Sequence, residues 1–133
     1  MLFKKLYYYY HHYKMWNYIV GQLKAHPHAS LNDIKIAYLG KINYDDKRYL
    51  HYNFCYLCSY VRLIRPIGTL NCISCPLCKK YNKTCFERSS LYQKVRLNLS
   101  STPGERIAMA EKIRDCVLFW KNRRYKRNNN ESN

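Results

Sequence analysis

Apolar and aromatic residues recur at steps of three and four along the first part of the chain. This spacing predicts one helix over residues 2–25, which Pro27 ends. His11 and His12 are adjacent, so they point to different sides of such a helix, and we expect both at the surface. The predicted inner face of this helix consists of Leu6, Tyr9 or Tyr10, Tyr13, Trp16, Ile19 or Val20, and Leu23.

Polar residues with capping chemistry predict where further helices begin. Ser30 and Asp33 have the spacing of a capping box before a short helix that ends at Gly40. Asp45 or Asp46 can cap one more helical turn, from Tyr49 to Tyr52. The short helix carries three residues able to reach the first one: Ile34, Tyr38 and Leu39.

The C-terminal part contains the clearest helix start in the chain. Thr102 stands at the N-cap, Pro103 at the first helical position and Glu105 two residues later. An earlier helix begins at Ser89 or Ser90 and carries Leu91, Tyr92, Val95, Leu97 and Leu99. The inner face of the last helix is predicted from Ile107, Met109 or Ala110, Ile113, Cys116 or Val117, and Trp120, with Cys116 as a core thiol.

Six of the seven cysteines lie between Cys55 and Cys85. Two C-x-x-C pairs, Cys55 with Cys58 and Cys72 with Cys75, are separated by thirteen residues. Each pair can direct two thiolates from one turn at one ion, which predicts a tetrahedral zinc site with these four ligands. Cys85 or Cys78 is the alternative ligand.

Two other states of these cysteines stay open. The run Cys72, Cys75, Cys78 has the spacing of half an iron–sulfur motif, although Cys85 follows too late to complete it. Disulfides or free thiols are the other possibility. If zinc binds, it contributes on the order of 10 kcal/mol, which exceeds the stability of a typical domain, so the segment should unfold without metal.

These elements predict a mainly α fold: a small helical domain with a central irregular zinc-binding segment. We expect one domain over 1–127, with N-terminal helices in 1–52, the zinc-binding segment in 53–88 and C-terminal helices in 89–127. Residues 128–133 are polar and are expected to form a disordered tail.

The net charge of the chain indicates which class of partner it binds. Its 24 lysines and arginines against 8 acids give a formal charge of +16, which favours binding to polyanions, although an AT-rich genome also yields basic proteins. Some of the lysines and arginines near the cysteines can instead balance the negative charge of the thiolates. The candidate nucleic-acid contacts are Arg62, Arg65, Lys79, Lys80 and Lys83 around the cysteines, and Lys121, Arg123, Arg124, Lys126 and Arg127 near the C-terminus.

Several absences limit the function classes. No apolar run approaches the roughly 18–20 residues that a bilayer requires, and the first residues lack a signal-peptide pattern, so we expect an intracellular protein without membrane contact. His51 is the last histidine, and no Gly-rich phosphate loop or Gly-x-Ser-x-Gly is present. We therefore expect no enzyme activity and no small-molecule substrate.

The cysteine motifs resemble a group of small uncharacterised bacteriophage zinc-binding proteins. The likeness covers roughly residues 50–118 and rests on Cys55-Tyr-Leu-Cys58-Ser-Tyr60, then Asn71-Cys72-Ile-Ser-Cys75-Pro76-Leu77, then Cys85. Cys78 and the Tyr-rich first helix depart from that pattern. The resemblance implies a phage origin and a Zn²⁺ site but no activity.

Two functions from different classes follow. The first is a non-catalytic phage accessory protein that binds nucleic acid or a nucleoprotein complex in the host cytoplasm. The alternative is an interaction factor that acts against a bacterial defence complex or redirects the transcription machinery, with tyrosines and arginines supplying the contacts.

Overall fold

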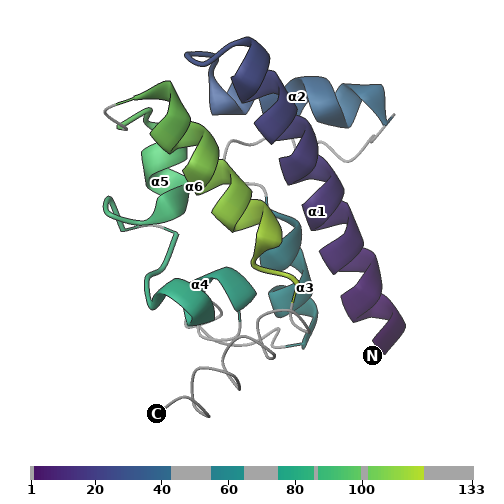
Figure 1. The fold of residues 1–133 in the computed structure, drawn as a ribbon. Coiled ribbons are helices and arrows are strands. Elements are labelled where there is room, and N and C mark those ends of the chain that lie inside the picture. Colours follow the sequence, from purple (N-terminus) through teal and green to yellow (C-terminus); the bar gives the residue numbers. More distant parts are fainter. Residues whose placement is uncertain (1, 43–54, 65–74, 86, 100–101, 119–133) are drawn as a thin grey trace, which may run out of the picture.

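The computed structural model describes residues 2–42, 55–64, 75–85, 87–99 and 102–118 of the 133. Helices account for the regular structure in these ranges, which contain no strand, and the predicted mainly α fold is confirmed. No helix of the described part is long and apolar enough to cross a membrane. The helices are α1 (Leu2–Ala25), α2 (Leu31–Lys41), α3 (Tyr56–Ile64), α4 (Pro76–Tyr81), α5 (Leu91–Arg96) and α6 (Pro103–Asp115) (Figure 1).

Hydroxyl caps begin three helices at the positions that the sequence predicts. Ser30, Ser90 and Thr102 each accept the backbone N–H three residues later, at 3.3, 3.2 and 3.2 Å. These bonds satisfy backbone donors that have no partner within the helix, so the capping side chains fix the residues at which α2, α5 and α6 begin. The first helix is confirmed over 2–25, and α2 continues one residue past Gly40.

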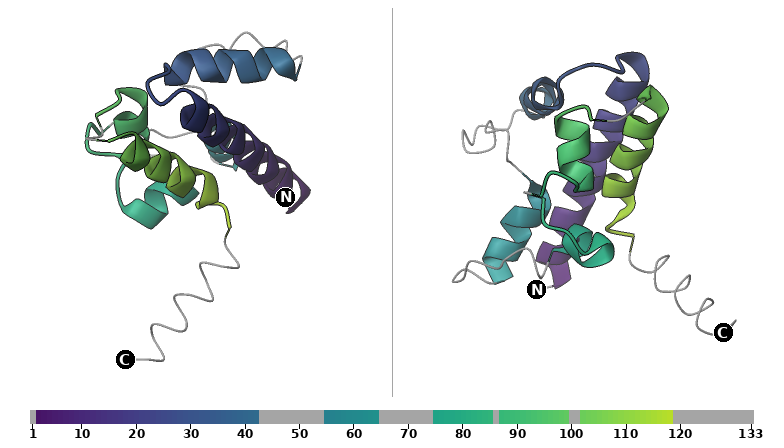
Figure 2. Two further views of the ribbon diagram at one scale, coloured as in Figure 1. Left: turned by 45° about the horizontal axis from the view of Figure 1, so that its top comes forward. Right: turned by 90° about the vertical axis from the view of Figure 1, so that its left-hand side faces the viewer.

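α1 is the central element, and α2, α3 and α6 all pack against it. Figures 1 and 2 show α6 running alongside α1 in the opposite direction, with α5 on the far side of α6. Both figures also place α3 and α4 at the end of the molecule where α1 begins. The buried part of α1 contributes Met15, Trp16, Ile19, Val20 and Leu23 to the core.

The predicted inner face of the first helix is confirmed only in part for its first half. Of the alternatives Tyr9 and Tyr10, Tyr9 packs against the core, whereas Leu6 and Tyr10 are 56% and 58% exposed. Tyr8 and Tyr9 both face α3, where their rings lie 5.9 and 5.6 Å from that of Tyr60. Contact with α3 therefore sets which side of α1 is covered at this end, and helical periodicity alone does not.

The central segment also differs from its prediction as irregular, because its described parts contain α3 and α4. The helix after Ser90 is shorter than expected: it ends at Arg96, and Leu97 and Leu99 are exposed. Asn98 between them has a positive φ of 52°, which breaks the helical course of the chain. Trp120, the turn predicted before Tyr52 and the tail at 128–133 lie outside the described residues.

Arg106 is a buried cation that the sequence pattern does not predict. Its side chain is on α6 and is 1% exposed. The guanidinium donates to the carbonyl of Val95 at 3.0 and 2.8 Å, and to those of Pro27 and Ala29 at 2.9 and 2.8 Å. One side chain thus joins α6 to the end of α5 and to the turn between α1 and α2.

Replacing Arg106 with Met should lower the free energy of unfolding by about 3 kcal/mol or more, because buried carbonyls lose charged donors. Urea denaturation measures the loss. Lys112→Met is the matched control, since Lys112 is exposed on the same helix, and should change stability by less than about 0.5 kcal/mol. Equal stabilities of the two variants would show that Arg106 does not hold these elements together.

Candidate metal centre

The structure describes two pairs of cysteines three residues apart, Cys55 with Cys58 and Cys75 with Cys78, and both pairs have the same position relative to a helix. The carbonyl of Cys55 accepts the N–H of Ser59 at 3.1 Å as α3 begins, and the carbonyl of Cys75 accepts the N–H of Lys79 at 2.9 Å as α4 begins. The second cysteine of each pair therefore lies in the first turn, on the side of the first. α3 and α4 lie at the same end of the molecule (Figure 2), so the fold brings the two pairs to one region.

The thiols within each pair interact directly. A hydrogen bond from Cys58, with a further one from His12, lowers the pKa of Cys55 well below its ordinary value. The same contact raises the pKa of Cys58, because one thiol must keep the shared proton. The bond with Cys78 likewise raises the pKa of Cys75.

Cys75 is the thiol that links the two pairs. It lies within electrostatic reach of Cys55 and of Cys58. Cys85 also affects Cys58, and Cys116 at the end of α6 is within reach of Cys55, Cys75 and Cys78. The fold therefore gathers thiols from four separate stretches of the chain.

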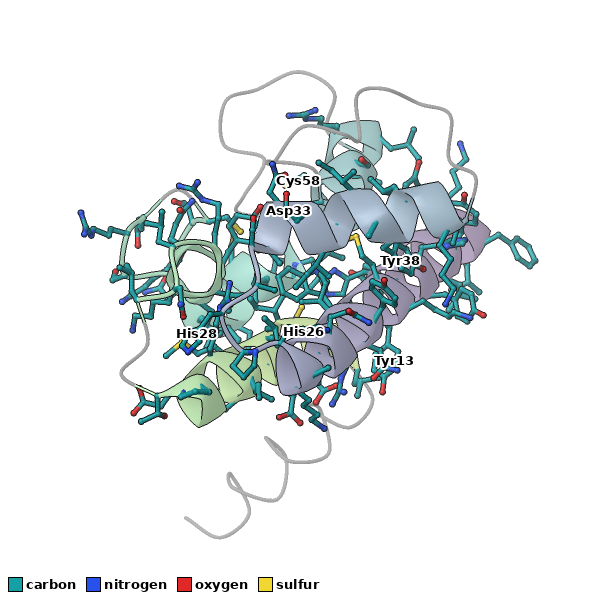
Figure 3. All side chains as sticks on the ribbon, turned by 90° about the horizontal axis from the view of Figure 1, so that it is seen from above. Tyr13, His26, His28, Asp33, Tyr38 and Cys58 are labelled. Carbon is teal, nitrogen blue, oxygen red and sulfur yellow. The ribbon has the colours of Figure 1, made fainter. Side chains whose placement is uncertain are left out.

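A buried lysine faces this cluster from α2. Lys35 is 2% exposed, and its Nζ donates to the hydroxyl of Tyr92 at 2.7 Å. Burial lowers the pKa of Lys35 to about 8, while Cys55, Cys58 and Cys85 act in the opposite direction. In the view from above, Cys58 is seen beside α2 (Figure 3), and the ammonium group is placed to balance negative charge on these thiols.

His12 corrects the prediction that both neighbouring histidines are at the surface. Its side chain is 0% exposed, and Nε2 donates to the carbonyl of Ile113 at 2.7 Å. The Sγ of Cys116 lies 3.7 Å from the same nitrogen. Helical spacing contains the signal, because His12 precedes the buried Trp16 by four residues and so shares its face. His11 is half-buried and stacks on Tyr56.

The other described histidines lie elsewhere. His26 and His28 are exposed at the turn between α1 and α2, away from Cys58 (Figure 3). His12 is thus the histidine that the fold brings to the thiols in the described part of the chain.

The predicted zinc ligands are brought together in part. Cys55, Cys58 and Cys75 lie in one cluster with the alternatives Cys78 and Cys85, and Cys72 is outside the described residues. No disulfide joins the cysteines that are described. Among the described residues, no three His, Cys, Asp or Glu side chains are already arranged to hold a metal ion.

The predicted nucleic-acid contacts are exposed where the structure describes them. Arg62 lies in the last turn of α3, and Lys79 and Lys80 lie on α4. Lys83 follows α4, and its Nζ donates to the hydroxyl of Ser89 at 3.0 Å. Arg65 and the C-terminal group, Lys121, Arg123, Arg124, Lys126 and Arg127, fall outside the described residues.

A second basic surface lies on the N-terminal half of α1, and we call it the α1 face: Phe3, Lys4, Tyr7, Tyr10 and Lys14, whose Nζ lies over the ring of Tyr10. Its three rings are 84%, 50% and 58% exposed, and α1 contains no acidic residue. An open surface pocket of about 440 Å³ lies beside it, lined by Phe3, Lys4, Tyr7, Tyr8 and Leu63. Exposed rings next to lysines can stack on bases while the cations contact phosphates.

No known family model, curated protein or solved structure matches the chain.

Tyr92→Phe should lower the free energy of unfolding by about 2 kcal/mol, because the buried ammonium of Lys35 loses an acceptor. Chemical denaturation of the purified protein checks this. Tyr7→Phe, at a half-exposed tyrosine of the α1 face, should leave stability within about 0.5 kcal/mol of the parent. An undiminished stability of Tyr92→Phe would mean that this hydrogen bond does not support the buried lysine.

Proposed function

We propose that the chain is a zinc-stabilised, non-catalytic protein that binds nucleic acid or a nucleoprotein complex. The observation that carries the proposal is the α1 face, where exposed aromatic rings alternate with lysines on a chain of formal charge +16. Because its cysteine motifs resemble those of small bacteriophage zinc-binding proteins, we further propose that it is a bacteriophage accessory protein that acts in the host cytoplasm.

Electrostatics supports nucleic acid as the partner. Lys4, Lys5 and Lys14 lie on the half of α1 whose rings are exposed, and Arg62, Lys79 and Lys80 are exposed on α3 and α4 at the same end of the molecule. Neutralising phosphates with such cations releases counterions, which makes binding favourable and dependent on salt. The rings add stacking that tolerates any base sequence.

The zinc site has a structural role in this proposal. Cys55, Cys58 and Cys75 supply three thiolates, and the sequence offers Cys72, Cys78 or Cys85 as the fourth. An ion bound there would join the starts of α3 and α4, two short helices that carry part of the basic surface. A site with four protein ligands leaves no position for substrate, which supports a non-catalytic role.

The alternative is an interaction factor that inhibits or redirects a bacterial defence or transcription complex. The pocket beside Phe3, Tyr7 and Leu63 favours it, because an apolar side chain of a protein partner can enter such a pocket. Both functions use the same end of α1, and they differ in whether the contact needs phosphates.

Replacing Lys4 and Lys14 with Gln should weaken binding to DNA and RNA oligonucleotides roughly tenfold at low salt, because two phosphate contacts are lost. Fluorescence anisotropy from about 50 to 200 mM salt should show the slope of log K against log salt falling by about two. Lys24→Gln at the opposite end of α1 is the control and should change neither value. Binding by the parent protein that is absent, or independent of salt, would exclude this function and favour a protein partner.

Protein purified under reducing conditions should contain one zinc ion per chain. Cys55→Ser should lose the metal, because it removes the thiol that both Cys58 and Cys75 contact electrostatically. Cys116→Ala is the control and should keep it, since Cys116 is expected to be a core thiol. Elemental analysis with protein quantification measures the ratio. Full zinc content in Cys55→Ser, or iron in place of zinc in the parent, would overturn the zinc assignment.

A further inference from the structure

Three exposed aromatic rings lie in a row on α1. Phe3, Tyr7 and Tyr10 are four and three residues apart, so their side chains leave the helix on the same side. They are 84%, 50% and 58% exposed, and Leu6 beside them is 56% exposed. An apolar surface of this kind with lysines at its margin is typical of a binding site.

His11 connects this row to the core. Its ring lies 4.3 Å from the ring of Tyr7 and 5.4 Å from that of Tyr10, and it stacks on Tyr56 of α3 at 5.5 Å. Tyr56 is 2% exposed, so these contacts tie the exposed rings to a fixed side chain. Rings that are already ordered before binding lose less conformational entropy when a flat partner stacks on them.

The open pocket between α1 and α3 lies at the start of this row. Its volume is about 440 Å³, and it is lined by Phe3, Lys4, Tyr7, Tyr8 and Leu63. These side chains offer rings, apolar surface and one ammonium group. A nucleobase with its phosphate matches this combination, because the face of the base stacks on a ring while the phosphate contacts the cation.

Charge indicates what kind of partner occupies this surface. Neither α1 nor α3 contains an acidic residue, and Lys4, Lys14 and Arg62 are exposed on them. Two copies of the chain meeting here would bring like charges together, which opposes self-association. An anionic partner is favoured instead. Each unit of a nucleic acid carries both a negative charge and an aromatic base, so this anion matches a row of rings beside lysines.

We infer that the α1 face binds single-stranded nucleic acid, whose unpaired bases stack on Phe3, Tyr7 and Tyr10, with one base in the pocket beside Leu63. The inference rests on the proposed function and specifies the form of nucleic acid that is bound. A duplex presents the edges of its bases in the grooves and keeps their faces stacked on each other, so it cannot cover these rings. Stacking accepts every base, so the sequence of the strand should have little effect.

Fluorescence anisotropy with the reduced full-length protein tests this form of binding. The probe is a labelled DNA strand of about 12 nucleotides, used alone and annealed to its complement. The parent should bind the single strand at least about tenfold more tightly than the duplex at the same salt concentration, because the duplex can use only the phosphate contacts.

A double variant separates stacking from charge. Phe3→Leu combined with Tyr7→Leu keeps apolar side chains and every cation but removes two rings. It should bind the single strand at least about tenfold more weakly, while the slope of log K against log salt stays that of the parent. Tyr13→Leu is the matched control and should bind like the parent, since the ring of Tyr13 lies 5.5 Å from the guanidinium carbon of Arg114 on α6 and thus outside the row. Circular dichroism should show the same helix content in all three proteins.

Two results would overturn the inference and leave the proposed function standing: equal affinities for the single strand and the duplex, or a double variant that binds the single strand as tightly as the parent. Phosphate contacts alone would then account for binding. If the parent binds neither form, the proposed function fails as well, and binding of an acidic peptide with an aromatic residue would then indicate a protein partner.

Discussion

The packing of α6 against α1 is the contact on which the other elements depend. Two buried polar side chains fix it at separate points: Arg106 donates to carbonyls of the α1–α2 turn, and His12 donates to the Ile113 carbonyl. Apolar residues alone would allow the helices to slide, because apolar contact has no direction, whereas buried hydrogen bonds require one alignment. This alignment also decides which groups meet at the end of the molecule where α1 begins.

The thiol cluster combines groups that are costly when buried. Thiols at the starts of α3 and α4 and at the end of α6 interact electrostatically with one another, with the ammonium of Lys35 on α2 and with the imidazole of His12 in the middle of α1. A small helical protein needs a reason to bury such groups, since each must be desolvated. The zinc–thiolate centre that we propose would supply one, because the metal would hold the thiolates and the ammonium would balance their charge. In the proposed function, the basic side chains outside would then contact the anionic partner.

The sequence predicts features whose cause is local. The caps of Ser30, Ser90 and Thr102 are confirmed because each bond joins residues three positions apart. The buried polar groups are missed because their partners are distant along the chain: Lys35 meets Tyr92, and Arg106 meets Pro27. His12 illustrates both cases. Its spacing of four residues from Trp16 predicts that it lies on the buried face, whereas only the fold shows that the Ile113 carbonyl is its hydrogen-bond acceptor. The spacing of the cysteine pairs predicts zinc but contains no information on the buried His12 and Lys35 that the fold brings to the thiols.

The most direct test of this account is X-ray absorption at the zinc edge of the purified protein. The fine structure gives the number of sulfur and nitrogen neighbours without any substitution. The account predicts one zinc ion with four sulfur ligands at about 2.3 Å. A zinc ion bound by fewer sulfur atoms would contradict the four-cysteine site, and a protein free of zinc would contradict the metal centre itself.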